Sequence, residues 1–234
     1  MKKLEFLGIG GATNIKFGGN SAYLKDDDNL LVIDMCEGVT EKLNNLESFK
    51  DIKNIYVAIT HTHFDHVAGL GVFIWYCNFY LNIKPKIIYS NLKYVNNIKK
   101  LLKLTGVDEN YVEFIKDKSF IINDLTLELK PTIHTPNLQC FGIMFKDNLG
   151  KYYYTGDTFD INYIKQLNND ETIKTIYTEV ATETYGVHIK YDDIKELNKE
   201  KLILMHFDTV DLYELAKKDE YNVATIKKVL KKDL

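Results

Sequence analysis

Six consecutive residues, 61–66, hold the densest group of side chains able to do chemistry: His-Thr-His-Phe-Asp-His. Three imidazoles and a carboxylate lie closer together here than ordinary core or surface positions require. Imidazole nitrogens and carboxylate oxygens are the donors that divalent zinc, manganese and iron bind. The chain has six histidines, and the other three, at 134, 188 and 206, lie downstream among further residues able to bind metals. The pattern predicts a metal site with two metal ions.

Two apolar runs flank this group and are expected to position it. The run 55–59 predicts a strand that ends just before it, and the uncharged run 67–83 predicts a helix that follows it. Loops at the carboxyl ends of strands commonly carry catalytic side chains in α/β folds. The second run is just long enough to cross a bilayer. It contains Asn78 and Asn82 and starts directly after the metal-binding residues, which favours a helix buried behind the site and no membrane span. Its aromatic residues are predicted to be core, with an oligomer contact or a pocket wall as the alternative: Phe73, Trp75, Tyr76, Phe79 and Tyr80.

The remaining pattern alternates strands and helices. Strands are expected at 4–7, 21–24, 30–34, 86–89, 120–130, 140–145, 152–155, 175–178 and 202–205. Helices are expected at 39–49, 91–104, 161–167 and 192–197, with amphipathic helices closing the chain. This order fits an α/β sandwich of four layers, in which helices cover two sheets. We expect residues 1–234 to form one such domain.

Composition narrows the class of substrate. The chain is 45% hydrophobic with a net charge of −3, and its 30 basic residues are all lysines. A protein that tracks a long nucleic acid needs a strong positive field, which this balance does not provide. Without arginine, phosphate binding must depend on metals, lysines, hydroxyls and backbone amides. Three dispersed cysteines and no apolar leader segment predict a cytoplasmic protein with reduced thiols.

His-x-His-x-Asp-His after an apolar strand resembles the signature of the metallo-β-lactamase superfamily. Further landmarks follow in that family's order: His134 in Pro-Thr-Ile-His-Thr-Pro, Asp157 in Tyr-Thr-Gly-Asp-Thr and His206 in Leu-Ile-Leu-Met-His-Phe. Residues 6–11 and 32–34 also resemble the family's opening strands, so the resemblance covers nearly the whole chain. It implies the four-layer αββα fold. Taken alone, the three landmarks have plainer interpretations, as a turn histidine, a helix cap and a core histidine.

The resemblance also implies the ligands of two divalent ions, zinc first, with manganese or iron as alternatives. One ion would be held by His61, His63 and His134, and the other by Asp65, His66 and His206. Asp157 would bridge them, because a carboxylate has two oxygens, and Gly156 would let the backbone pass close to the metals. Asp34 is either an outer acceptor that orders the metal loop or a turn residue at a strand end.

Two stretches resemble one branch of the superfamily, the transfer-RNA 3′-processing endonucleases and their phosphodiesterase relatives. They are Phe-Leu-Gly-Ile-Gly-Gly-Ala near the N-terminus and His-Thr-Pro-Asn-Leu-Gln-Cys-Phe-Gly from position 134. Glu179 and His188 resemble the residues that transfer protons in that branch, although the family's His-Glu pair reads Thr178-Glu179 here. The implied reaction is attack by a metal-bridging hydroxide, with Asp65 in the catalytic metal site and His188 as general acid. The alternative for His188 is an exposed loop histidine.

The chain lacks the Gly/Pro-rich basic arm that grips transfer RNA in these endonucleases, so a small phosphodiester is expected. The compact relatives that it resembles include the phage-encoded anti-Pycsar enzymes, which hydrolyse 3′,5′-cyclic nucleotides to 5′-monophosphates. Gly10, Gly11 and Asn20 are candidates to bind the phosphate, with tight turns between strands as the alternative. The alternative functions are an endonuclease for RNA 3′ ends, a lactone, thioester or β-lactam hydrolase, and a non-catalytic binding protein. Relatives of this fold often dimerise, which implies a homodimer.

Overall fold

Two six-stranded sheets form the centre of the computed structural model, which describes residues 3–46, 49 and 51–227. The first sheet contains, in spatial order, β1 (Glu5–Gly8), β2 (Ser21–Asp26), β3 (Asn29–Ile33), β4 (Asn54–Ala58), β5 (Lys86–Tyr89) and β6 (Glu113–Lys116). The second contains β12 (Leu202–Met205), β11 (Ile173–Glu179), β10 (Gly150–Tyr154), β9 (Cys140–Asp147), β8 (Leu125–Thr132) and β7 (Phe120–Ile122). Both are mixed: β3 to β6 and β10 to β12 pair in parallel, and the other neighbours pair antiparallel.

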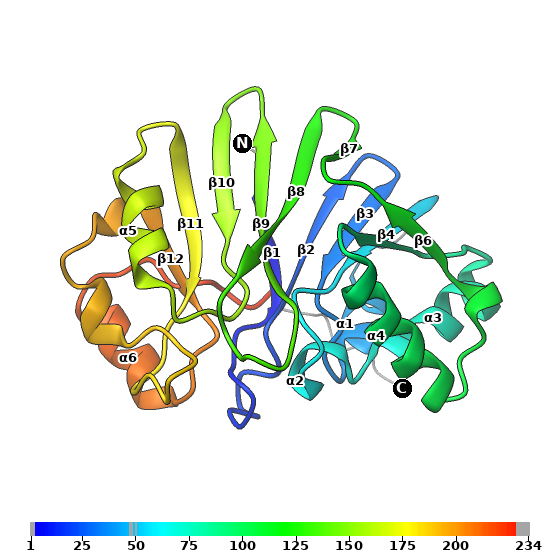
Figure 1. Cartoon of the computed structure of the whole chain (residues 1–234), viewed down its shortest axis with the longest axis horizontal. Helices are drawn as coiled ribbons and strands as arrows, with labels where there is room; N and C mark the ends of the chain where they lie inside the picture. Colours follow the sequence, from blue (N-terminus) through cyan, green and yellow to red (C-terminus); the bar gives the residue numbers. More distant parts are fainter. Residues whose placement is uncertain (1–2, 47–48, 50, 228–234) are drawn as a thin grey trace.

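Helices cover the outer faces of both sheets. They are α1 (Val39–Asn44), α2 (Phe64–Val67), α3 (Leu70–Tyr76), α4 (Leu92–Leu104), α5 (Ile161–Asn169) and α6 (Val210–Lys218). Figure 1 shows α1, α3 and α4 outside the first sheet, with α5 and α6 outside the second. The predicted four-layer αββα sandwich is therefore confirmed.

Strand β3 shows how the sequence makes two cores from one sheet. Successive side chains of a strand point to opposite faces. Leu31 and Ile33 accordingly join the core between the sheets, whereas Leu30 and Val32 join the core beneath α1, α3 and α4. All four are buried, so the strand is apolar throughout rather than alternating, as expected for a strand covered on both faces.

The long helix predicted at 67–83 is interrupted. It is divided into α2, α3 and a π-helical turn, Cys77–Leu81. Gly69 lies between the first two helices. A Cβ at this position would lie 2.3 Å from the carbonyl oxygen of Cys36, so a glycine is needed here. Its own N–H donates to the carbonyl of Met35 at 2.8 Å. The break therefore lets the chain pack closely against the end of the loop that follows β3.

Four other elements differ from the prediction. The helix expected at 39–49 ends at Asn44, and that expected at 192–197 is a 3₁₀ turn, Tyr191–Ile194. The strand expected at 120–130 is the hairpin β7–β8, which reverses at Asn123, where φ is 52°. Strand β6 was not predicted, because it lies at the sheet edge and none of its side chains is fully buried. After α6 the chain turns at 219–220 and forms isolated bridges with Leu204 and Phe6, and the predicted helix beyond 227 lies outside the described residues.

No helix among the described residues is both long enough and apolar enough to cross a membrane.

Candidate metal centre

Five strand ends bring the predicted site residues together. His61 follows β4, His134 follows β8, Asp157 follows β10, and His206 follows β12. Glu179 is the last residue of β11. Because β10, β11 and β12 are parallel, their carboxyl ends meet at one edge of the second sheet. Residues that are far apart in the chain therefore converge on one place.

Two sharp turns after these strands orient the side chains of Asp157 and His206. Gly156 and His206 both have left-handed backbones, with φ of 58° and 56°. A Cβ on Gly156 would lie 2.6 Å from the carbonyl oxygen of Phe141 and 3.1 Å from Cβ of Thr60. Only glycine lets the loop carrying Asp157 approach the metal-binding loop this closely, which agrees with the predicted role of Gly156.

The first ligand set comprises His61, His63 and His134. Nδ1 of His63 lies 2.9 Å from Nε2 of His61 and 3.2 Å from Nε2 of His134. Oδ2 of Asp157 lies 3.8 Å and 3.9 Å from those two Nε2 atoms. Donors about 2.0–2.1 Å from one tetrahedral ion are separated by about 3.3 Å. One ion can therefore bind among these atoms.

The second ligand set comprises Asp65, His66 and His206. Oδ2 of Asp65 lies 3.4 Å from Nε2 of His66 and 3.6 Å from Nε2 of His206. Oδ2 of Asp157 lies 3.4 Å from each of the same two nitrogens. Asp157 therefore stands between the two ligand sets, as a bridging carboxylate must.

Three buried atoms of this cluster have no hydrogen-bond partner among the described residues. They are Nε2 of His66, Nε2 of His206 and Oδ1 of Asp157. A buried polar atom without a partner costs about 1–3 kcal/mol. Binding a cation would satisfy such atoms, so the residues present fit a divalent metal.

The two sets differ in their electrostatics. Burial lowers the pKa of His61 well below its usual value, and it also lowers the pKa of His63 and of His134. Burial acts in the same direction on His66 and His206, but the charge of Asp157 and other carboxylates outweighs it and raises the pKa of both. The first set is therefore neutral and ready to donate lone pairs, whereas protons compete with a metal at the second.

Outer hydrogen bonds fix the orientation of the imidazoles. Asp34 accepts from Nδ1 of His66 at 2.8 Å, and from the backbone N–H and hydroxyl of Thr60 at 2.7 and 2.9 Å. Asp34 therefore makes the contacts expected of the predicted outer acceptor, and it orders the loop that carries His61 and His66. Nδ1 of His134 bonds to the carbonyl of Val187 at 2.7 Å. Each contact leaves Nε2 for the centre, which is how metal-binding histidines are usually held.

A second pair of residues lies beside the ligands. Oε2 of the fully buried Glu179 lies 2.6 Å from Nδ1 of His188, and its Oε1 accepts from the backbone N–H of Thr158. The His188 ring stands 5.1 Å from the ring of His134 and 5.5 Å from that of His206, with 21% of its side chain exposed. The alternative of an exposed loop histidine is therefore wrong.

The three residues predicted to bind phosphate use their donors within the protein. The N–H of Gly10 already donates to the carbonyl of Gly18, and that of Gly11 to the carbonyl of Phe207, both at 2.8 Å. Asn20 is fully buried, and its amide donates to the hydroxyl of Tyr154 at 2.7 Å. Gly10 and Gly11 hold the loop before β2 in place, and Asn20 connects the start of β2 to the second sheet, so their contact with a phosphate stays a prediction. Thr60, which links Asp34 to the metal loop, was missed, and its place directly before the first histidine was the available signal.

Comparison with known proteins gives a consistent result. The family model described as "Anti-Pycsar protein Apyc1" matches residues 2–229. The protein of that name from Paenibacillus harenae is 29% identical over 228 residues, covering 90% of this chain and 92% of the relative. The one from Paenibacillus sp. (strain J14) is 30% identical over 222 residues, covering 88% and 89%. The metallo-β-lactamase fold protein YhfI from Bacillus subtilis has a TM-score of 0.75 at 18% identity, over 96% of this chain and 97% of that one.

Proposed function

The chain belongs to the anti-Pycsar protein Apyc1 family, and from that premise we propose that it hydrolyses 3′,5′-cyclic nucleotides to 5′-monophosphates. Its family and its metallo-β-lactamase fold make it a metal-dependent hydrolase. The observation that carries the proposal is the convergence of two ligand sets on one carboxylate oxygen, with a buried Glu–His pair beside them. Metal-binding side chains and a general acid are the groups that metal-dependent hydrolysis of a phosphodiester uses.

Seven residues would hold two ions, for which we propose zinc. His61, His63 and His134 would bind one, Asp65, His66 and His206 the other, and Asp157 both. Bound ions would supply Lewis acidity and a nucleophilic water. The chain's own contribution is to hold the donors rigidly: the rings are fixed by Asp34, Thr60 and Val187 and need not reorganise during the reaction.

His188 is the proposed general acid. Glu179 binds Nδ1 of its ring, which leaves Nε2 to donate a proton to the departing sugar oxygen. Such general acid catalysis typically contributes about 10²–10⁴-fold to the rate.

Two further features support a small substrate. The net charge of −3 does not favour a long polyanion. A cavity of about 360 Å³ opens beside Asp65, which suits a mononucleotide. The homodimer expected from the sequence stays a prediction. Phe79 and Tyr80, which are 62% and 79% exposed, are the side chains that such an interface would cover.

The test is turnover of the four common 3′,5′-cyclic nucleotides by metal-loaded protein, with a precursor transfer RNA and a lactone assayed in parallel. We expect cyclic nucleotides to give 5′-monophosphates and Asp157→Ala to give none. Cleavage of the RNA alone would make the protein an RNA-processing nuclease. Hydrolysis of the lactone alone would place it among the carbonyl hydrolases.

A further inference from the structure

A cavity lies beside the second ligand set. Its lining includes Gly11, Ile15, Phe64 and Asp65. Asp65 is a ligand, and a Cβ on Gly11 would lie 3.3 Å from the ring of His206. The cavity therefore adjoins the place where the proposed function puts the scissile phosphate.

Two large apolar side chains border this cavity while remaining exposed. Phe64 is 80% exposed and Ile15 is 93% exposed. Exposed apolar residues are common on protein surfaces, but these two stand at the rim of a cavity that reaches a metal ligand. Phe64 is also held between His63 and Asp65, in the first turn of α2, where His66 and Val67 are the residues that face the core.

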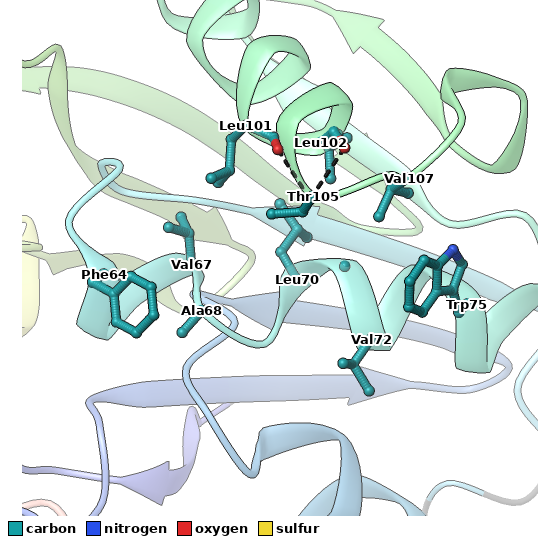
Figure 2. Close-up of a pocket in the computed structure, with 11 residues that line it drawn as sticks. Phe64, Val67, Ala68, Leu70, Val72, Trp75, Leu101, Leu102, Thr105 and Val107 are labelled. Carbon is teal, nitrogen blue, oxygen red and sulfur yellow. Dashed lines mark hydrogen bonds between the residues drawn. The ribbon is translucent and has the colours of Figure 1, made fainter.

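Phe64 also marks the boundary between two cavities. A separate apolar groove of about 240 Å³ begins at Phe64 and follows α3 to Val72 and Trp75, as Figure 2 shows. Val72 lines only that groove, whereas Phe64 lines both. Phe64 therefore lies where the cavity beside the metal ligand Asp65 meets the apolar groove.

The rim of the first cavity indicates which part of a substrate belongs there. Phe64 and Ile15 present exposed apolar side chains to it, and Asp65 beside them is one of the proposed metal ligands. With the scissile phosphate at that ligand, the cavity is left for a flat, apolar part of the substrate. Aromatic side chains bind nucleobases by stacking, because every base has a flat π face.

We propose that Phe64 is the stacking platform for the nucleobase of the substrate and that Ile15 borders the same pocket. This inference rests on the proposed function and adds a specificity residue to it. Stacking recognises a base by its flat face alone, so all four bases are accepted, with purines favoured by their larger area.

The experiment compares two substrates that differ only in the base. One is a 3′,5′-cyclic nucleotide, and the other is methyl ribofuranoside 3′,5′-cyclic phosphate, which has no base. Phe64→Ala is expected to raise KM for the nucleotide by about 5- to 150-fold, with kcat and two bound ions retained. The baseless substrate is expected to react equally well with both proteins. Phe64→Trp is expected to restore the wild-type KM, and Val72→Ala, a matched exposed residue of the other groove, is expected to behave as wild type.

Two results would overturn the inference. An unchanged KM for the nucleotide would mean that Phe64 does not touch the base. Equal losses on both substrates, or a lost ion, would make Phe64 a structural residue of the metal loop.

Failure of the proposed function would look different, because the wild-type protein would then hydrolyse neither substrate. Binding of a nucleoside 5′-monophosphate, measured by equilibrium dialysis, would still test the platform. Weaker binding by Phe64→Ala supports it, and equal binding by both proteins overturns it.

Discussion

The two ligand sets use the same kind of side chain in opposite electrostatic settings. Behind the first set lie neutral groups, the hydroxyl of Thr60 against His61 and the carbonyl of Val187 against His134. Behind the second lie buried carboxylates: Asp34 is 2.8 Å from Nδ1 of His66, and Glu179 is 3.7 Å from Nδ1 of His206. Burial determines the pKa of the first histidines, and neighbouring carboxylates determine that of the second.

The comparison shows that the electrostatic character of a histidine ligand depends on the group that contacts its Nδ1. The second set contains a carboxylate of its own, Asp65, whose pKa is lowered by His206 and His66, whereas burial raises the pKa of Asp34 and Glu179 behind it. It is therefore the more negative environment and is expected to hold a divalent cation more tightly. The first set offers three neutral imidazoles and depends on Asp157 for charge.

The largest effect is expected where the two sets meet. Asp157→Ala removes the carboxylate oxygen that lies within 3.9 Å of four Nε2 atoms, and it leaves Asp65 as the carboxylate that His66 and His206 share. We expect turnover to fall by at least about 10³-fold, since charge stabilisation at both ions is lost. Metal analysis should show fewer than two ions per chain. Two ions and normal turnover would mean that the sets do not share Asp157.

Glu179→Gln should produce the next largest loss without emptying either set. Replacing the carboxyl group that holds Nδ1 of His188 is expected to lower kcat by about 10²–10⁴-fold, as loss of the general acid would. The double variant Glu179→Gln, His188→Ala should be no slower than His188→Ala alone, because the two residues act as a unit. Additive losses would show that Glu179 works through His206 instead.

Asp34→Asn should weaken metal binding at one ligand set and leave the other unchanged. We expect a loss of about 10–100-fold in affinity for one ion, the one held by His66, with the other ion unaffected. Thr60→Val is the matched change behind His61, and it is expected to have a smaller effect because it removes no charge. Competition with a chelator measures both affinities. Equal weakening at both positions would contradict the asymmetry.

Removing the metal should lower thermal stability. At 100 times the dissociation constant, a ligand that binds only the folded state stabilises it by about 2.7 kcal/mol. For a chain of this size, each kcal/mol changes the midpoint by about 2–4 °C. A melting curve with and without chelator should therefore differ by about 5–10 °C. An unchanged midpoint would mean that the buried unpaired atoms are not metal ligands.

The smallest effect concerns the alkylation rates of two thiols near the metal centre, those of Cys140 and Cys36. Burial raises the pKa of Cys140 to about 11 and raises that of Cys36 further, where Asp34 and Asp65 add to it. The thiolate of Cys140 is therefore scarce at neutral pH. Its alkylation should accelerate about tenfold per pH unit from 8 to 10. Cys36 should react more slowly throughout, and rapid reaction of either thiol at pH 7 would contradict these environments.

Much of the candidate site could be predicted because its ligand types are scarce and follow apolar strands. His134, Asp157 and His206 each stand just after a strand, and the group at 61–66 is contiguous. Backbone donors could not be predicted in this way. The partners of Gly11 and Asn20 lie on strands or loops more than 130 residues away.

The secondary structure could likewise be predicted where local sequence determines it, and not where distant residues do. Buried strands such as β3 and β4 were recognisable from their apolar runs, whereas β6 was missed because it is partly exposed at an edge. The break at Gly69 depends on the carbonyl of Cys36, which no local pattern reveals. Phe64 was overlooked for a related reason: whether it faces solvent or core depends on how α2 lies against the first sheet.

The most direct test of a shared two-metal centre is anomalous diffraction from crystals grown with zinc. The account predicts two ions, each about 2.0–2.2 Å from its own ligands, one among His61, His63 and His134 and one among Asp65, His66 and His206, with Asp157 bound to both. A single ion in an active preparation, or a second ion away from Asp157, would contradict it.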